Sequence, residues 1–410
     1  MTRPINFGAG PSALPESVLR DASDALLDFE GTGIGIAEIS HRSKEFTAFV
    51  KKTEALIRTQ LSVPSTHHIL FTQGGGTGQF SAVVYNFLAR YRLLHPDDSE
   101  PVLDYVLTGS WSKKASEEAK RLGASRVHIA ADARGQSSKT FTRIPAHSEY
   151  TFSPDPALIY YCENETVDGV QFSHDASSPA SFPFDRLPTN TLLPLVADYS
   201  SSFMSRPIPR LADHALIFAG AQKNIGPAGL TILIVRNDCL VDVDAAAALG
   251  APPVPVSMAY KTIADAVSLY NTPSVLALYI SGLVLDRSQK LGGVEYYEQV
   301  NRRKAEKVYD ALRDGEAKGI YRAKVEQGSG SWMNVVFDVL GDGAEAKFIA
   351  GAEQQGMKAL KGHRSVGGSL SPSHVSCYLQ LFPGIRASLY NAITEEQTDQ
   401  LVAYMRQFSI

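Results

Sequence analysis

The fold class is decided by one stretch, His68-Ile69-Leu70-Phe71-Thr72-Gln73-Gly74-Gly75-Gly76-Thr77-Gly78-Gln79-Phe80. Its apolar first part is typical of a strand and its glycines of a tight turn, and a helical pattern continues to about Arg90. Such a turn presents free backbone N–H groups and the positive end of a helix dipole, an arrangement that binds phosphate. The stretch therefore predicts an α/β fold with an anion site, although a glycine-rich turn without a ligand is the alternative.

The pattern around the glycines indicates which kind of phosphate would bind. The dinucleotide pattern G-x-G-x-x-G fails, because Gln79 or Ser81 stands at its last position. No G-K-[ST] of a nucleotide-binding loop follows either. A small phosphate-bearing cofactor is therefore favoured over NAD or ATP.

Six further strand-like runs follow the first, and helical or loop segments separate most of them. This alternation predicts a largely parallel sheet of seven strands with crossover helices. Functional side chains in such sheets gather beyond the carboxyl ends of the strands. The six runs are Val102–Leu107, Ser125–Ile129, Leu158–Glu163, Leu192–Ala197, Ala215–Phe218 and Leu230–Val235.

Lys223 lies among small residues between the last two of these runs, in Ala219-Gly220-Ala221-Gln222-Lys223-Asn224-Ile225-Gly226-Pro227-Ala228-Gly229. An amine that is desolvated there loses preference for its ammonium form and becomes a nucleophile. Carbonyl chemistry, and above all a Schiff base with pyridoxal phosphate, needs such a lysine. The alternative is a solvated lysine on a turn, which is the commoner situation of this residue type.

Three more candidates lie just beyond strand-like runs. Asp198 directly follows the run Leu192–Ala197, and a carboxylate beside a pyridine nitrogen keeps that ring protonated and electron-withdrawing. Trp111 is suited to stacking on such a ring, and Thr166 lies in the loop Asn164–Gly169. A core aromatic residue and a turn carboxylate are the alternatives for Trp111 and Asp198. The order of glycine loop, strand-end aspartate and lysine nevertheless favours a pyridoxal-phosphate site.

Composition restricts the class of protein. The 410 residues, 44% hydrophobic and 20% charged, are typical of a globular protein with two domains. A net charge of -4 argues against nucleic-acid binding, and no apolar stretch reaches the roughly 20 residues of a membrane span. Residues 1–8 contain no apolar signal region. Because Cys162, Cys239 and Cys377 are scattered, we expect neither disulfides nor a metal site, and a cytoplasmic location.

The C-terminal part predicts a second, smaller α/β domain. Its pattern is a short alternation of helices and strands, which follows an alanine- and proline-rich segment that ends near Tyr270. We expect a large cofactor-binding domain over residues 16–279 and a small domain formed by residues 1–15 and 280–410. The predicted elements of the small domain are Ser274–Leu291, Val294–Leu312, Trp332–Leu340, Ala344–Gln355, Lys358–Leu360 and Thr394–Phe408.

Seven motifs, in this order, resemble those of the phosphoserine aminotransferase family, which are fold-type I pyridoxal-phosphate enzymes of class V. The resemblance implies transfer of the amino group from glutamate to 3-phosphohydroxypyruvate, which gives O-phospho-L-serine and 2-oxoglutarate in serine biosynthesis. The seven motifs are Phe7–Pro11, Ser40–Arg42, Gly74–Phe80, Asn164–Gly169, Ala219–Gly229, Asn271–Pro273 and Lys361–Arg364.

The resemblance also implies a role for each cofactor-binding residue. Lys223 would form the Schiff base with pyridoxal 5'-phosphate and move the proton, and Asp198 would pair with the pyridinium nitrogen. Trp111 would stack on the ring, and Thr166 would bond its 3-hydroxyl group. The cofactor phosphate would be held by Gly76, Thr77 and Gln222, together with Asn271 and Thr272 from the neighbouring subunit. A homodimer with shared active sites follows from this last expectation.

Substrate binding needs further cations, because both substrates carry more than one negative group. An arginine fork holds a carboxylate in bidentate fashion, and a His-Arg pair suits a distal carboxylate or phosphate. By resemblance, Arg386 would bind the α-carboxylate. The distal anion would be bound by His41 and Arg42 of the partner together with His363 and Arg364.

Two features depart from the family pattern. Ala9 stands where some relatives have serine, which removes a side-chain hydrogen bond. Sixteen residues, Ser369–Gly384, precede Ile385 where relatives have almost none. We hypothesise that this segment is an exposed loop or translated intron sequence, and sequencing the mature transcript decides between the two. If the segment is real, its deletion is expected to leave activity intact or improve it.

Two other functions were weighed. Another pyridoxal-phosphate enzyme, such as an aminotransferase for a different amino acid or a cysteine desulfurase, is less favoured. The repeated His-Arg pairs indicate a second anion, and no cysteine lies in a candidate active-site loop. A non-catalytic binding protein would not need Lys223, Asp198 and the glycine loop together.

Overall fold

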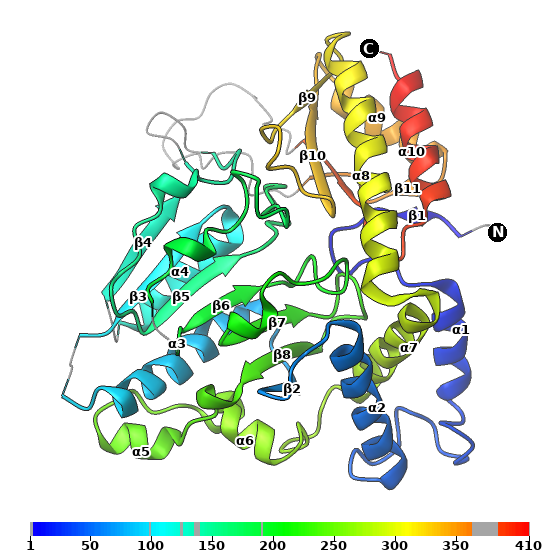
Figure 1. Ribbon diagram of the computed structural model, residues 1–410. Coiled ribbons are helices and arrows are strands. Elements are labelled where there is room, and N and C mark those ends of the chain that lie inside the picture. Colours follow the sequence, from blue (N-terminus) through cyan, green and yellow to red (C-terminus); the bar gives the residue numbers. More distant parts are fainter. Residues whose placement is uncertain are drawn as a thin grey trace, which may run out of the picture.

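The computed structural model describes residues 3–97, 100–123, 126–134, 140–189, 192–362 and 384–409. Figure 1 shows a large unit built on one broad sheet and a smaller unit beside it, at the upper right of the view. The first and last elements, β1 (Ile5–Asn6) and α10 (Glu395–Gln407), lie together in the smaller unit. The chain therefore begins in the small unit, builds the large one and returns.

The large sheet has seven strands in the order β2-β8-β7-β6-β5-β3-β4. Within this sheet β8 pairs antiparallel with both neighbours, and the other neighbouring strands pair parallel. The predicted mostly parallel, seven-stranded sheet is thus confirmed. The strands are β2 (His67–Thr72), β3 (Val102–Leu107), β4 (Arg126–Asp132), β5 (Leu158–Cys162), β6 (Leu195–Asp198), β7 (Leu216–Gly220) and β8 (Thr231–Arg236).

Helices cover both faces of this sheet because side chains alternate along each strand. On β7, Leu216 and Phe218 pack in a core with α3 and α4, whereas Ile217 and Ala219 pack in a second core with α1, α2 and α7. Burying one such large apolar side chain contributes about 1.5–3 kcal/mol. These helices are α1 (Glu16–Ala25), α2 (Lys44–Gln60), α3 (Gly75–Leu94), α4 (Ser110–Leu122) and α7 (Val275–Leu291), and α5 (Val243–Ala248) and α6 (Tyr260–Asp265) lie between β8 and α7 in the chain.

The smaller unit has its own core, which combines Ile5 and Phe7 with residues of the C-terminal part. Its central strand β10 pairs antiparallel with β9 and β12, and β1 pairs parallel with β11. The division at residue 280 stays a prediction, because α7 still packs in a core of the large unit. The elements are α8 (Gly293–Glu316), β9 (Tyr321–Ala323), β10 (Asn334–Val339), α9 (Ala344–Gln354), β11 (Met357–Lys358) and β12 (Ile385–Ser388).

The sequence patterns located most elements to within a few residues, with some exceptions. Strand β6 begins at Leu195 rather than Leu192, directly after Pro194, which cannot donate a ladder hydrogen bond. The short strands β9 and β12 were not predicted, since three or four residues are too few to display a period. Among the described residues, no helix is long and apolar enough to cross a membrane.

Candidate active site

A cavity of about 300 Å³ lies where β5 and β6 end, at the carboxyl edge of the large sheet. This is the edge at which open α/β sheets bind their ligands. Seven of the sequence-predicted residues line it, and so do the other glycines of the loop at the start of α3. The lining residues are Gly10, Gly74, Gly75, Gly76, Thr77, Trp111, Cys162, Asn164, Thr166, Asp198, Ser200, Ser201, Gln222 and Lys223.

Lys223 lies in the loop between β7 and β8, and its side chain enters the cavity with 9% of the residue exposed. Its Nζ donates to the Ala9 carbonyl at 2.8 Å and lies 3.4 Å from Thr166 Oγ1. Burial lowers the pKa of Lys223 to about 8, the Arg386 guanidinium adds to this shift, and Asp198 opposes it. Near pH 8 the amine is therefore a neutral nucleophile for much of the time.

The N-terminal segment closes over this lysine. Gly10 has a φ of +128°, and a side chain there would meet Lys223 Cδ at 2.9 Å, so only glycine fits. The Ser12 hydroxyl donates to the Lys223 carbonyl, and the Tyr390 hydroxyl donates to the Ala9 carbonyl at 3.0 Å. The serine absent at position 9 is thus not needed to hold Lys223, because the backbone carbonyl of Ala9 accepts from its amine.

Asp198 ends β6, the strand that pairs with β7 just before the lysine loop. Asp198 therefore ends the strand that neighbours the one leading into the lysine loop. The carboxylate is 5% exposed, and its Oδ1 accepts from the Ser200 N–H at 2.8 Å. Burial raises the pKa of Asp198, while the bonds from Ser200 and the charge of Lys223 oppose the rise. A cationic ring nitrogen beside it would restore the charged form.

The glycine loop forms the N-terminus of α3. Gly74, with a φ of 98°, is the residue before the helix, and the Gly75 N–H donates to Thr231 Oγ1 at 2.9 Å. The next two N–H groups, of Gly76 and Thr77, have no acceptor within a helix and face the cavity side of the loop. Free N–H groups and the positive end of the helix dipole suit an anion, so the anion site stays a prediction at this place, and Gln222 lines the same cavity.

Trp111 is the second residue of α4 and lines the cavity, with its ring centroid 6.4 Å from that of Phe80. The backbone N–H of Trp111 donates to Glu165 Oε2 at 2.8 Å, and the backbone N–H of Ser112 donates to Glu165 Oε1 at 2.9 Å. Asp168 accepts from the Ser110 N–H at 2.6 Å. Both acids belong to the motif Asn164–Gly169, but nothing in the spacing indicates that they meet the start of a helix more than 50 residues earlier in the chain.

The two acids share one environment. Burial raises the pKa of Glu165, and the neighbouring Asp168 raises it further, against the N–H groups of Ser112 and Trp111. Burial likewise raises the pKa of Asp168, against its bonds from Ser110. Burial thus shifts both acids of the loop after β5 toward their protonated form, while backbone N–H groups at the positive end of α4 stabilise the charged form.

Arg386 reaches the site from β12 in the smaller unit. Its Nη1 lies 3.4 Å from the Thr166 carbonyl, and burial lowers its pKa. The Gly362 N–H donates to the Gly384 carbonyl at 2.8 Å, so the residues on either side of 363–383 are bonded to each other. The Arg386 N–H donates to the Leu360 carbonyl at 2.8 Å. The long segment therefore does not displace Arg386 from the neighbourhood of Lys223.

Besides Arg386, four of the predicted residues that the structure describes do not line the cavity of their own chain. His41 and Arg42 lie just before α2, where His41 Nε2 is buried with no hydrogen-bond partner among the described residues and Arg42 is exposed. Asn271 is exposed and donates to Gln73 beside the glycine loop at 3.1 Å. The roles of these residues and of Thr272 require a second chain and stay predictions. The predicted His363 and Arg364 lie outside the described residues, as does Cys377.

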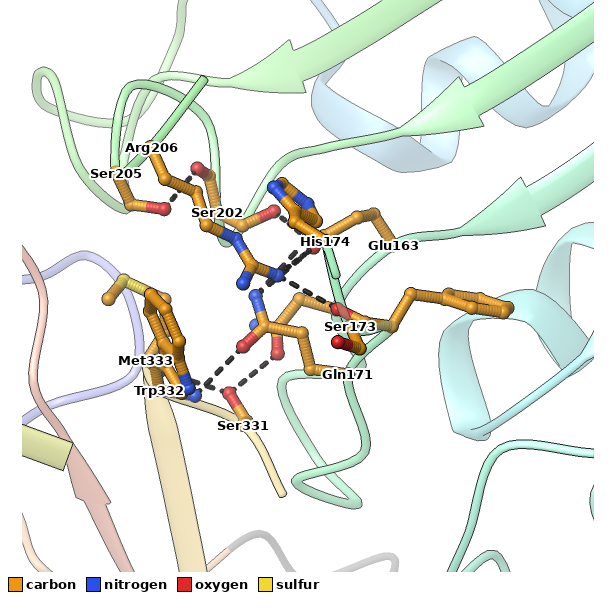
Figure 2. A network of polar contacts seen from close by, with 12 residues as sticks. Glu163, Gln171, Ser173, His174, Ser202, Ser205, Arg206, Ser331, Trp332 and Met333 are labelled. Carbon is orange, nitrogen blue, oxygen red and sulfur yellow. Dashed lines mark hydrogen bonds and ion pairs between the residues drawn. The ribbon is translucent and has the colours of Figure 1, made fainter. Parts of the chain in front are cut away.

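A second buried polar cluster lies beside the cavity, around Glu163 at the start of the loop that follows β5. Figure 2 shows Glu163 contacting Arg206 Nη2 at 2.6 Å and His174 Nε2 at 3.0 Å, and the Ser202 hydroxyl also donates to it. The Arg206 guanidinium lies over the Trp332 ring at 4.6 Å. Burial would raise the pKa of Glu163, but Arg206 and these neighbours lower it to about 2. The cluster joins the two units and does not line the cavity.

The cavity suits pyridoxal 5'-phosphate by its chemistry and its size. Its volume is at the lower end of the usual range for small-molecule sites, about 300–1,000 Å³. A helix N-terminus for the phosphate, a carboxylate for the ring nitrogen and a lysine of lowered pKa all face one space. Among the described residues, no cluster of His, Cys, Asp and Glu is arranged to hold a metal ion.

Comparison with known families agrees with this reading of the site. The model of the family described as Aminotransferase class-V matches residues 5–401. The chain therefore belongs to the class-V aminotransferases, which are pyridoxal-phosphate enzymes.

Within that class, relatives of similar length identify the family more narrowly. Phosphoserine aminotransferase of Paraburkholderia phytofirmans is 41% identical over 406 residues, which covers 99% of this chain and 98% of the relative. The corresponding protein of Pseudomonas aeruginosa is 39% identical with the same coverage. The chain belongs to the phosphoserine aminotransferase family.

Solved structures give the same family. The phosphoserine aminotransferase from Bacillus circulans subsp. alkalophilus has a TM-score of 0.82 and 35% identity, covering 98% of this chain and 97% of that one. The pyridoxal-phosphate-bound phosphoserine aminotransferase from Trichomonas vaginalis has a TM-score of 0.80 and 32% identity, covering 99% and 100%. The expected fold-type I architecture and cofactor are confirmed.

Proposed function

We propose that this chain transfers the amino group of glutamate to 3-phosphohydroxypyruvate, with 2-oxoglutarate and O-phospho-L-serine as products. This is the reaction implied by its membership of the phosphoserine aminotransferase family. The observation that carries the proposal is the meeting of Lys223, Asp198 and the α3 N-terminus around one cavity.

Each residue around the cavity has a proposed role. When bound, pyridoxal 5'-phosphate supplies an electron-withdrawing ring that stabilises negative charge at the substrate α-carbon. Asp198 keeps a proton on the ring nitrogen, and Trp111 covers a face of the ring. Lys223 Nζ would take the α-proton as a general base and return it as a general acid to the carbon on the other side of the transferred nitrogen, which is a 1,3-proton shift. Its lowered pKa suits both steps.

The remaining residues hold anionic groups. Gly76, Thr77 and Gln222 bind the cofactor phosphate, and Thr166 bonds the ring hydroxyl. Arg386 binds the substrate α-carboxylate with its planar fork. The distal carboxylate of glutamate and the phosphate of the keto acid share one set of cations, proposed as His41, Arg42, His363 and Arg364.

A homodimer with shared sites completes the proposal. Asn271 and Thr272 would reach the cofactor phosphate of the partner, and the exposed position of Asn271 beside the glycine loop is compatible with that task. We place the enzyme in the cytoplasm, since its proposed substrates are small polar molecules and its cysteines are scattered. Light scattering on the purified chain, with and without pyridoxal 5'-phosphate, tests the dimer.

A coupled transamination assay tests the reaction. The purified full chain with pyridoxal 5'-phosphate should be yellow, and its spectrum should change when glutamate is added. Turnover with 3-phosphohydroxypyruvate should exceed turnover with pyruvate or glyoxylate, because only the first fills the distal anion site. Equal rates with all three keto acids would indicate an aminotransferase of another specificity, and no spectral change with glutamate would indicate a non-catalytic protein.

A further inference from the structure

Glu165 holds the first turn of α4 with both of its carboxylate oxygens. One oxygen accepts from the N–H of Trp111 at 2.8 Å and the other from the N–H of Ser112 at 2.9 Å. Neighbouring Asp168 accepts from the Ser110 N–H at 2.6 Å, so three consecutive N–H groups are fixed by side chains from one distant loop. The backbone of the residue whose ring lines the cavity is thus set by Glu165 rather than by its own helix.

The glutamate side chain has no room to move sideways. Glu165 is fully buried, with 0% exposure. A methyl group on Gly109, the residue before the helix, would lie 2.4 Å from Glu165 Cδ, so the carboxylate lies flat on that glycine. The Glu165 carboxyl is buried against Gly109 and bonded through both oxygens, so it adopts one position. The N–H groups that it bonds are held in place in turn.

The same loop also contacts two other parts of the site. Thr166, the next residue, lies 3.4 Å from Lys223 Nζ through its hydroxyl and 3.4 Å from Arg386 Nη1 through its carbonyl. One short segment therefore contacts the ring-covering residue, the lysine and the substrate arginine. A shift of Glu165 relative to Thr166 would change the spacing between Trp111 and Lys223.

We propose that Glu165 is a positioning residue, whose carboxylate sets the depth of the Trp111 ring in the cavity and thereby the fit of the cofactor ring. The inference rests on the proposed function, since it assigns Trp111 to the ring of pyridoxal 5'-phosphate. Glu165 itself touches neither cofactor nor substrate in this role. It acts through the first turn of α4.

The test uses tryptophan fluorescence, because the chain has two tryptophans. Trp332→Phe leaves Trp111 as the single emitter, and Glu165→Gln in that background replaces one acceptor by an N–H donor that repels a helix N–H. We expect a shift in the Trp111 emission maximum of the cofactor-free protein. We also expect weaker pyridoxal-phosphate binding, by about tenfold, since a buried hydrogen bond to the first turn of α4 is lost. Glu165→Asp, which keeps the carboxyl group on a shorter stem, should show a smaller change in both.

The matched control is Asp242, which accepts from two consecutive N–H groups, of Asp244 and Ala245, at the start of α5. Helix α5 contributes no residue to the cavity. Asp242→Ala should lower the melting temperature but leave Trp111 emission and cofactor affinity at the values of the Trp332→Phe parent. This separates positioning from the general effect of losing a helix cap.

Two results would overturn the inference. One is a Glu165→Gln protein whose emission and cofactor affinity equal those of the parent. The other is a failure of both Glu165 variants to fold, which would make Glu165 a determinant of the fold alone. The proposed function fails separately, and only if the parent protein itself does not bind pyridoxal 5'-phosphate or respond to glutamate.

Discussion

Glu163 and Glu165 are both completely desolvated and lie two residues apart, yet their charges are handled in opposite ways. Glu163 is paired with Arg206 and His174, and its pKa falls to about 2 (Figure 2). Burial and the neighbouring Asp168 raise the pKa of Glu165, against the backbone N–H groups that bond it. The first glutamate belongs to the cluster that joins the two units, and the second bonds the helix start that carries Trp111, which lines the cavity.

The difference teaches where this protein keeps uncompensated charge. Around Glu163, each buried ionic group has an opposite charge within contact distance, which is the arrangement of a structural cluster. Around the cavity, burial lowers the pKa of Lys223 and raises the pKa values of Asp198 and Glu165, so the neutral form of each group is favoured. Such perturbed groups indicate a functional site, since a ligand is needed to complete their interactions.

The largest expected effect comes from removing the cavity lysine. Lys223→Ala should lower turnover by at least about 10⁴-fold, because both the covalent hold on the cofactor and the proton carrier are lost. Pyridoxal 5'-phosphate should then separate from the protein on gel filtration. Lys261→Ala, which removes an exposed lysine paired with Asp265, is the control and should retain full turnover. Turnover of Lys223→Ala at the control level would contradict the proposed role of Lys223 in holding the cofactor and carrying the proton.

Breaking the structural cluster should act on stability and not on the cofactor. Arg206→Met leaves Glu163 buried without its main partner and should cost about 3–5 kcal/mol of unfolding free energy, measured by urea denaturation. The control is Arg210→Met, which removes an exposed ion pair with Asp213 and should cost less than about 1 kcal/mol. Folded Arg206→Met should bind pyridoxal 5'-phosphate as the parent does. A change confined to cofactor binding would mean that the two regions are not distinct.

The acid dependence of stability should reveal Glu163. Its folded pKa lies below its ordinary value of 4.5, so the folded state binds fewer protons than the unfolded state between those pH values. The stabilisation is present above pH 4.5 and is lost as pH falls toward about 2, by up to about 3 kcal/mol. Glu163→Gln should flatten this dependence in urea titrations. Asp185→Asn, at an exposed carboxylate, should leave it unchanged; an equally steep curve in Glu163→Gln would contradict the assignment.

The smallest expected effect is a shift of a titration midpoint. Covalent capture of pyridoxal 5'-phosphate needs the neutral amine of Lys223, so its rate should rise with pH and level off above about 8. Because the Arg386 charge helps to lower this pKa, Arg386→Met should move the midpoint to higher pH. Stopped-flow absorbance measures both curves, with Arg210→Met as the control for removal of a distant arginine. A midpoint near the ordinary lysine value of 10.5 would show that the amine is solvated.

Much of the fold was predictable because its signals are local. The run His68–Thr72 followed by glycines predicted a strand, a turn and an anion-binding helix start, and β2, Gly74 and α3 occupy those positions. The apolar runs on either side of Lys223 are β7 and β8. Short β12 was not predicted, since its four residues pair with β10 through contacts that no local pattern announces.

The residues of the cofactor site likewise fall into those that a local pattern indicates and those that it does not. Lys223, Asp198, Trp111 and Thr166 could be selected as candidates because each stands just beyond an apolar run. Glu165 could not be given a role, because its effect depends on bonds to a helix more than 50 residues earlier in the chain.

By itself, the sequence determined the residue types, the order of the strands along the chain and the presence of a lysine in a loop of small residues. Only the tertiary structure decided that this lysine is buried under Gly10, bonded to Ala9 and close enough to Arg386 for its pKa to fall. The physical reason is that propensity and periodicity are properties of neighbours in the chain, whereas desolvation and charge pairing depend on distances in space. Glu163 and Glu165 illustrate this, since identical side chains two positions apart acquire opposite pKa shifts from partners that the fold alone brings to them.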